Sequence, residues 1–191
     1  MNNNTLVQYA KSFIGEHLDV KSYTEIGDRE RVVSYVMTED GYCPGTKVVS
    51  SVSLHKKDLG LFVSDSDLHL RMEVMLAGLP ENSYLEQALA QCALDIDDLE
   101  FCAYGTVLED AAALRMFYLK SEMKHFVLLS PVFWPKYSAF VSDSAIVAWL
   151  YAVPISDNEL DFMRENGLNA LQDLLEEKEA DVLDFYRPSV I

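Results

Sequence analysis

The sequence predicts an α+β fold, in which a mixed and twisted β-sheet is flanked by α-helices. Two segments, 125–133 and 145–155, are apolar on both faces, as central strands covered on each side are. Between residues 67 and 76, apolar side chains recur at every second position, from Leu68 to Leu76, which indicates a strand with one face on the core. Amphipathic helical patterns precede, separate and follow these segments. Together, the three observations predict helices packed on one sheet.

The first half of the chain predicts one helix and then three strands. Thr5 and Gln8 have the spacing of a capping box, and the apolar face that follows predicts a helix to about Gly15. The strands are β-rich segments bounded by turn signals, and a Gly-Leu-Pro turn ends the last of them. They are expected at residues 31–37, 47–54 and 68–76.

A second helix is predicted between Ser83 and Leu99. Ser83 and Glu86 again have capping-box spacing, and apolar residues then recur every three or four positions. The segment after this helix leaves two interpretations open. Residues 104–108 are read as a strand, and residues 110–114 open either a short helix or a loop.

Two short helices are predicted after the apolar strand at 145–155. Ser156 and Glu159 form a third pair with capping-box spacing, and Asn166-Gly167 is a helix stop signal. The last helix has leucines on one face and ends in an acidic run at 176–179. The chain therefore closes with two helices that follow its most apolar strand.

Composition and charge narrow the functional classes. The 191 residues are 50% hydrophobic and 24% charged, with no linker or repeat, so a single domain over residues 1–191 is expected. The 31 acidic and 15 basic side chains give a formal charge of −16, which opposes direct binding to nucleic acid. Such a surface either serves solubility alone or attracts a basic protein partner.

The cysteines, the N-terminal segment and the apolar segments indicate where in the cell the protein is expected. Cys43, Cys92 and Cys102 include no C-x-x-C pair and are interpreted as reduced thiols. The N-terminal segment shows no signal-peptide pattern, and the apolar segments are shorter than the ~20 residues that a membrane helix needs. We therefore expect a cytoplasmic protein without membrane association.

The sequence contains no recognisable catalytic motif. Nucleophile-elbow, zinc-protease, Walker and dinucleotide-binding patterns are absent. The histidines lie far apart in the sequence and are interpreted as ordinary surface or core residues: His17, His55, His69 and His125. No metal, cofactor or enzymatic activity is expected. A hydrolase built from scattered His and Asp side chains is the remaining catalytic hypothesis.

The most aromatic stretch, residues 133–137, supplies two candidate contact residues. Tyr and Trp are favoured anchors of protein interfaces, so Trp134 and Tyr137 are predicted to contact a partner. Core packing of Phe133 and a loop role for Pro135 are the alternative interpretation of this stretch.

The C-terminal third carries a family resemblance. An apolar strand from Ala145 runs through Ser-Asp-Asn-Glu at 156–159 into a Gly-x-x-x-Leu-x-x-Leu-Leu helix that begins at Gly167. Upstream, the strand at 68–76, the Gly-Leu-Pro turn and the helix at 83–99 stand in the family's order. In this combination the chain resembles the Suppressor of Fused domain, and it is similar to the short single-domain bacterial members.

This resemblance implies an α/β sandwich and a function. Bacterial members are implied to be immunity proteins that neutralise toxin domains, so the expected partner is a protein, here a basic toxin domain. In the family, an acidic residue just before the strand at 68–76 contacts the partner. Asp65, Asp67 and His69 are therefore predicted to line a peptide-binding groove, with ordinary solvation of the strand as the alternative.

Two functional hypotheses follow, neither of them enzymatic. The leading one is an immunity protein that blocks a toxin through an acidic surface. The alternative is a general peptide-binding adaptor that extends its sheet with a partner strand. The adaptor hypothesis predicts an exposed groove with unpaired backbone groups beside the strand at 68–76.

Overall fold

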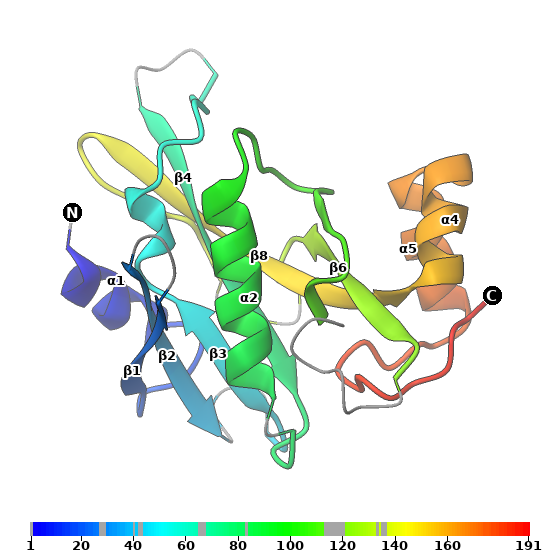
Figure 1. The fold of residues 1–191 in the computed structure, drawn as a ribbon. Helices are drawn as coiled ribbons and strands as arrows, with labels where there is room; N and C mark the ends of the chain where they lie inside the picture. The colour runs from blue at the N-terminus through cyan, green and yellow to red at the C-terminus, as the bar shows by residue number, and fades with distance from the viewer. Residues whose placement is uncertain are drawn as a thin grey trace.

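The fold was determined from a computed structural model, in which eight strands of the described residues form one mixed sheet in the order β1-β2-β3-β4-β8-β6-β5, with β7 on β8 (Figure 1). The structure describes residues 2–26, 30–39, 41, 44–64, 68–82, 84–112, 121–132, 134 and 137–191. The strands are β1 (Asp19–Ile26), β2 (Glu30–Glu39), β3 (Lys47–Ser51), β4 (His69–Gly78), β5 (Val107–Leu108), β6 (Met123–Leu129), β7 (Phe140–Val141) and β8 (Ala145–Ser156). The predicted α+β class is confirmed.

The centre of the sheet is the pair β4 and β8, which run parallel from His69 opposite Ala145 to Met75 opposite Tyr151. All other named strand pairs are antiparallel. β6 and β8 are buried along most of their length on both faces, so the prediction of central strands is confirmed. The covered faces explain why both strands read as nearly continuous apolar runs.

Helices cover both faces of this sheet. The described helices are α1 (Asn3–Ala10), α2 (Leu85–Asp98), α4 (Asp157–Asn166) and α5 (Leu168–Glu177), with a 3₁₀ turn, η1, at Leu54–Lys56. α2 packs on one face, in a core cluster that includes Val74 and Leu76 of β4. The next residue along β4, Met75, belongs instead to a second cluster with α1, α4 and α5. Alternate side chains of one strand therefore enter opposite cores.

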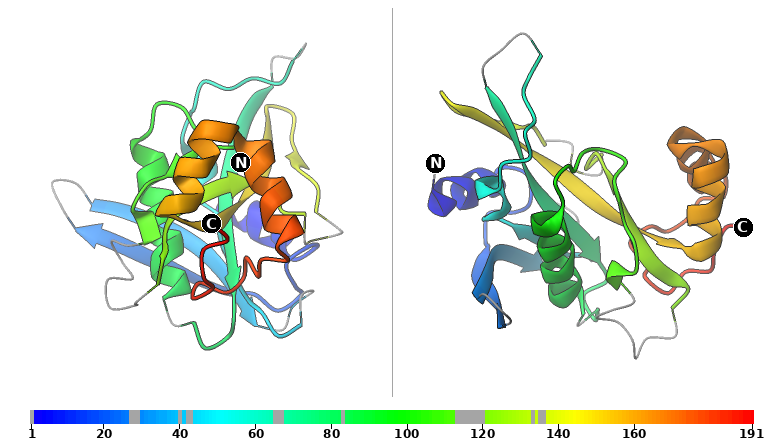
Figure 2. Two further views of the ribbon diagram at one scale, coloured as in Figure 1. Left: turned by 90° about the vertical axis from the view of Figure 1, so that its right-hand side faces the viewer. Right: turned by 45° about the horizontal axis from the view of Figure 1, so that its top comes forward.

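α4 and α5 stand at the far end of the molecule from α1 (Figures 1 and 2). They follow the end of β8 directly, because the N-cap of α4 is the last residue of that strand, Ser156. Gly167 separates the two helices at a φ of 91°, a backbone conformation that favours glycine. The predicted stop at Asn166-Gly167 is confirmed. None of the described helices has the length and hydropathy needed to cross a membrane.

Helix starts were predicted with mixed success. Ser156 and Glu159 form the predicted capping box in both directions. The capping box at Thr5 is wrong: Asn2 is the N-cap, its side chain accepts from the Thr5 N–H, and the helix ends at Ala10 rather than near Gly15. Ser83 lies outside the described residues. Glu86 does not cap α2, since its carboxylate binds side chains of β1, β2 and β3 instead.

The strand predictions need three corrections. β1 is a strand that was not predicted from the sequence. The predicted strand at 104–108 is present only as the two residues of β5, and residues 113–120 of the following segment lie outside the description. β4 is buried on both faces from Met72 onward. The prediction that its polar side chains face solvent is therefore wrong for Glu73, which is 0% exposed.

Candidate protein-interaction surface

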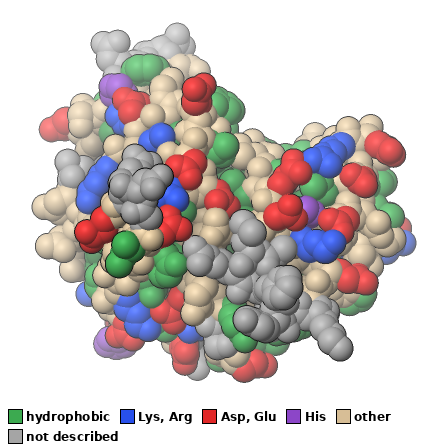
Figure 3. All heavy atoms as spheres, viewed as in Figure 1, with side chains coloured by type: hydrophobic (Ala, Val, Ile, Leu, Met, Phe, Trp, Pro, Cys, Tyr) green, Lys and Arg blue, Asp and Glu red, His purple; other side chains and the backbone are tan. Residues whose placement is uncertain are grey.

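The negative charge of the protein is concentrated at one end of the molecule. Between residues 157 and 186 the sequence has ten acidic and two basic residues, which is half of the formal charge of −16. Figure 3 shows more acidic than basic side chains on the lobe at its right, where α4 faces the viewer. The exposed carboxylates are those of Asp157, Asp161, Glu165, Asp173, Glu176, Glu177, Glu179 and Asp181. We call this set the acidic lobe.

Helical periodicity explains why these carboxylates face solvent. In α5, Leu171 and Leu175 are buried in the core, one turn apart. Asp173 and Glu177, which lie on the opposite side of the same turns, are exposed. In α4 only Leu160 among the apolar residues is fully buried, and the remaining surface is left to charged side chains. The lobe therefore displays charge on one side and packs on the sheet with the other.

A buried ion pair anchors the lobe to the C-terminal tail. The Arg187 guanidinium, 5% exposed as a residue, makes a bidentate pair with the Glu159 carboxylate at 2.6 and 2.9 Å. Arg187 also donates to the Pro154 carbonyl at 3.0 Å, at the end of β8. Glu159 accepts in addition from the backbone N–H groups of Ser156 and Val190. One carboxylate thus joins the strand, the helix start and the tail.

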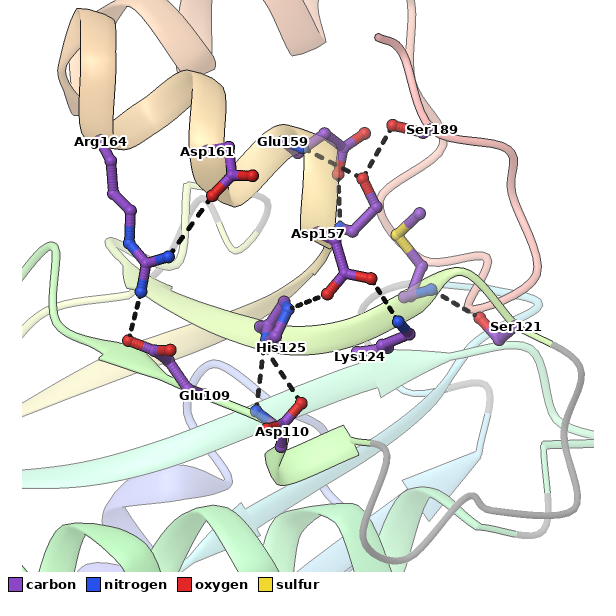
Figure 4. A network of polar contacts seen from close by, with 12 residues as sticks. Glu109, Asp110, Ser121, Lys124, His125, Asp157, Glu159, Asp161, Arg164 and Ser189 are labelled. Carbon is purple, nitrogen blue, oxygen red and sulfur yellow. Dashed lines mark hydrogen bonds and ion pairs between the residues drawn. The ribbon is translucent and has the colours of Figure 1, made fainter.

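A second polar network connects α4 to the sheet (Figure 4). His125 of β6 lies between Asp110 and Asp157, and its Nδ1 accepts from the Asp110 backbone N–H at 2.9 Å. The other ring nitrogen, Nε2, therefore carries the proton and donates to Asp157 Oδ1 at 2.9 Å. Hydrogen bonds from Lys124 and His125 hold the pKa of Asp157 below its ordinary value. Arg164 adds a contact to Glu109 at 2.6 Å.

This network orients α4 and offers no acid–base catalyst. A general base needs a ring nitrogen that is available to substrate, and both nitrogens of His125 are occupied by protein groups. The His125 ring is also almost fully buried. We conclude that His125 and Asp157 fix the position of the acidic lobe on β6.

His55 and His69 each contact a different carboxylate, and neither shares a partner with His125. His55 Nδ1 contacts the buried Glu73 carboxylate at 2.7 Å, and His69 Nδ1 lies 3.7 Å from Asp58. No group of three or more metal-ligating side chains occurs among the described residues. Cys92 and Cys102 are buried, and burial raises the pKa of both thiols, that of Cys102 to about 11. A thiolate nucleophile is not favoured at either position.

Comparisons with known proteins decide the family. The model of the Suppressor of fused protein (SUFU) family matches residues 28–188. The chain belongs to the SUFU family. The resemblance expected from the sequence is thereby confirmed, and the match extends from β2 through α2 to the acidic lobe.

Individual relatives agree with this assignment. Immunity protein YqcF of Bacillus subtilis (strain 168) is 30% identical over 150 residues, which are 78% of this chain and 77% of that protein. A SUFU homologue from Neisseria gonorrhoeae has a TM-score of 0.68 at 17% identity, with 99% of this chain and 96% of the other covered. The Sufu–Fu complex structure has a TM-score of 0.60 at 13% identity, with 98% and 90% covered. Both structures support the fold.

The structure describes three of the five predicted contact residues of this SUFU-family chain, namely His69, Trp134 and Tyr137. Asp65 and Asp67 lie outside the described residues. His69 is partly exposed, and its ring is tilted against that of Phe62 with centroids 4.7 Å apart. It lies opposite Ala145, where β4 begins to pair with β8. The half-buried Tyr137 bonds to β8 further along, since its hydroxyl donates to the Trp149 carbonyl and accepts from the Trp149 N–H. That these residues contact a partner stays a prediction.

Trp134 is 2% exposed and packs edge-on against Tyr151, with ring centroids 5.5 Å apart. Its side chain belongs to the second core cluster, with α1, α4 and α5. In this conformation it fills the core and has little surface for a partner. Phe133 and Pro135, to which the alternative interpretation of this stretch refers, lie outside the described residues. The role of Trp134 as a partner contact also stays a prediction.

The predicted groove beside the strand at 68–76 is wrong. β4 is an interior strand, with β8 on one side and β3 on the other. Where β3 ends, the loop before β4 pairs with this edge of β4 instead. The Leu70 N–H donates to the Leu61 carbonyl at 2.8 Å, and the Val63 N–H donates to the Leu68 carbonyl at 3.0 Å. A partner strand therefore cannot add at β4 without displacing this loop.

Proposed function

We propose that this SUFU-family protein is an immunity protein that binds a cationic toxin domain through the acidic lobe. The observation that carries the proposal is the concentration of half of the negative charge on α4, α5 and the start of the tail. The family relationship to a protein named as an immunity protein supports the same function. The Sufu–Fu complex supports binding of another protein by a member of this fold.

The physical basis of the proposal is electrostatic steering. A surface of one sign raises the rate of association with an oppositely charged partner by about 10- to 1,000-fold at low salt. A toxin domain that acts on nucleic acid needs cations in its substrate cleft, and an acidic lobe competes with nucleic acid for those cations. The protein then acts by occupancy, without catalysis or a cofactor. Its expected cytoplasmic location stays a prediction.

The test uses the candidate partner encoded beside this gene. The two proteins are co-expressed and co-purified, and their association rate is measured at several salt concentrations. The variant Asp173→Asn/Glu176→Gln/Glu177→Gln should lower the association rate about 10-fold and flatten its salt dependence. The matched control, Glu16→Gln/Asp19→Asn/Glu81→Gln, removes three exposed carboxylates from elsewhere. Equal effects of both triple variants, or a partner that is not recovered, would overturn the proposal.

A second candidate function is an adaptor that adds a partner strand at β1. One observation favours it: β1 is an edge strand of eight residues and is mostly exposed, with Val20 and Ile26 at 60% and 88%. Exposed edges of this kind are templates for strand pairing. Amide hydrogen exchange of the complex separates the two functions. Protection confined to 19–26 favours the adaptor, and protection on α5 favours the immunity protein.

A further inference from the structure

A groove runs between α5 and the β6–β8 part of the sheet. Its volume is about 770 Å³, which falls within the ~300–1,000 Å³ typical of ligand pockets. Leu129 of β6 and Val153 of β8 line it from the sheet, and Leu175 lines it from α5. The groove is therefore walled mainly by the apolar side chains that join the acidic lobe to the sheet.

Exposed apolar residues extend the groove to the surface. Tyr104 and Val132 are both lining residues, and they are 48% and 76% exposed. The Tyr104 hydroxyl donates to the Gln172 side chain of α5 at 2.8 Å, so this end of the groove is held by a contact between the loop and the helix. An apolar floor that continues into exposed apolar rim residues is typical of an interaction site.

The charge at the rim has one sign. Glu176 and Glu179 line the groove, both are exposed, and neither has an ion pair among the described residues. No lining residue is basic. Glu176 lies in the last turn of α5 and Glu179 lies just after the helix ends, so the negative end of the helix dipole adds to their field. The rim therefore attracts cations and repels anionic molecules such as fatty acids.

From this combination we propose that the groove binds a protein segment in which one large apolar side chain is flanked by lysine or arginine. The apolar side chain fills the groove against Leu129, Val153 and Leu175. The flanking cations pair with Glu176 and Glu179. A buried apolar anchor inside a polar rim is the arrangement typical of protein interfaces. A second copy of this chain does not fit well, because each copy carries a formal charge of −16. This inference rests on the proposed function and specifies its contact.

The test uses a defined probe, the peptide Lys-Lys-Phe-Lys-Lys, on the ¹⁵N-labelled full chain. Amide shifts are followed at about 0.15 M salt, where long-range attraction is screened. We expect perturbed amides around Leu129, Val153 and Leu175. Replacement of the central Phe by Ala should weaken binding at least ~10-fold, as loss of a buried aromatic anchor does. The peptide Glu-Glu-Phe-Glu-Glu should leave these amides unperturbed.

Matched variants test the rim and the floor separately. Glu176→Gln/Glu179→Gln should weaken binding of the cationic peptide about 10-fold, whereas Glu165→Gln/Asp173→Asn, which removes two lobe carboxylates away from the groove lining, should weaken it less than about 2-fold. Ala180→Phe narrows the groove and should also weaken binding, and its amide spectrum reports whether the variant is folded. Equal binding of the Ala and Phe peptides, or perturbation only at β1, would overturn the inference.

The outcomes separate this inference from the proposed function. If the toxin-like partner binds through the acidic lobe while the groove variants bind it normally, the groove inference is wrong and the immunity function stands. If the peptide occupies the groove as expected but no toxin-like partner is captured, the groove inference stands and the immunity function is wrong.

Discussion

Two regions of this protein use carboxylates in opposite ways. Beside the start of α2, Glu86 accepts from the Tyr35 hydroxyl at 2.6 Å and binds Lys47 and Lys21 at 3.0 and 3.2 Å. On the acidic lobe, Asp173 and Glu176 are exposed and make no ion pair with a described residue. The first arrangement is satisfied within the fold. The second leaves its charge available to another molecule.

Net charge alone therefore says little about which carboxylates are available for binding. Partners of Glu86 come from β1, β2 and β3, so its charge connects the helix to three strands. Burial opposes its ionisation, but the hydrogen bonds from Tyr35, Lys47 and Lys21 outweigh burial and lower its pKa to about 2. Exposed carboxylates without partners contribute little to stability and can be changed without unfolding the chain. Variants at paired and unpaired carboxylates should therefore differ in their effect on stability.

Arg187→Met should have the largest effect on stability. It removes the partner of Glu159, which is 0% exposed, and leaves a buried carboxylate without its cation. Removing one partner of a buried pair typically lowers the free energy of unfolding by about 3–5 kcal/mol. Urea denaturation measures the loss. Arg164→Met is the control, because its pair with Glu109 is half-exposed and should contribute less than about 1 kcal/mol. A similar loss for both variants would contradict the buried anchor.

Acid should weaken the Glu86 contacts next. Since the folded pKa is about 2 and the ordinary value is 4.5, the stabilisation is fully present above pH 4.5 and is lost as the pH falls through 2. The shift corresponds to roughly 2–3 kcal/mol for this 21%-exposed side chain. Urea unfolding across this pH range should show a decline that Glu86→Gln reduces. An unchanged acid dependence in the variant would place the titrating group elsewhere.

Tyr35→Phe should have a smaller effect of the same kind. It removes the hydroxyl that donates to Glu86 while it keeps the aromatic ring in the core. Hydrogen bonds to charged groups contribute about 1.5–3 kcal/mol, so a loss near the lower limit is expected beside two remaining lysines. Thermal and urea unfolding measure it. Tyr186→Phe, at a residue that is 55% exposed, is the control and should change stability by less than about 0.5 kcal/mol.

Neutralising the acidic lobe should change stability least. Asp173→Asn/Glu176→Gln/Glu177→Gln should shift the free energy of unfolding by no more than about 0.5 kcal/mol per site, and reduced repulsion favours a slight increase. The same variant is expected to lose association rate with a cationic partner. A loss of more than about 2 kcal/mol would show that these carboxylates support the fold, and the two regions would then differ less than proposed.

Local patterns in the sequence were sufficient for several elements. The Ser156–Glu159 capping box and the stop at Gly167 depend on neighbours within a few residues, so their spacing predicts them. The apolar runs of β6 and β8 predicted burial on both faces because burial is imposed along the whole strand. The excess of acidic residues predicted a charged surface, but its location on one lobe required the orientation of α4 and α5.

Contacts between distant parts of the chain could not be read from those patterns. The alternating pattern around Glu73 is the same whether this face of the strand is exposed to solvent or covered. The loop at His55 packs on it and buries the Glu73 carboxylate, and the pattern does not predict that contact. Arg187 stands 28 positions after Glu159, and no sequence periodicity relates the two. β1 was missed for a similar reason, because an exposed edge strand carries a weak apolar signal.

Composition and short-range spacing were enough to predict the fold class, the central strands, the caps of α4 and the size of the negative charge. The tertiary structure decided where the carboxylates are paired and where they remain exposed. It also places β4 inside the sheet and leaves a groove beside α5. Such features depend on which surfaces meet across the fold, and that meeting is set by the joint packing of segments far apart in the chain.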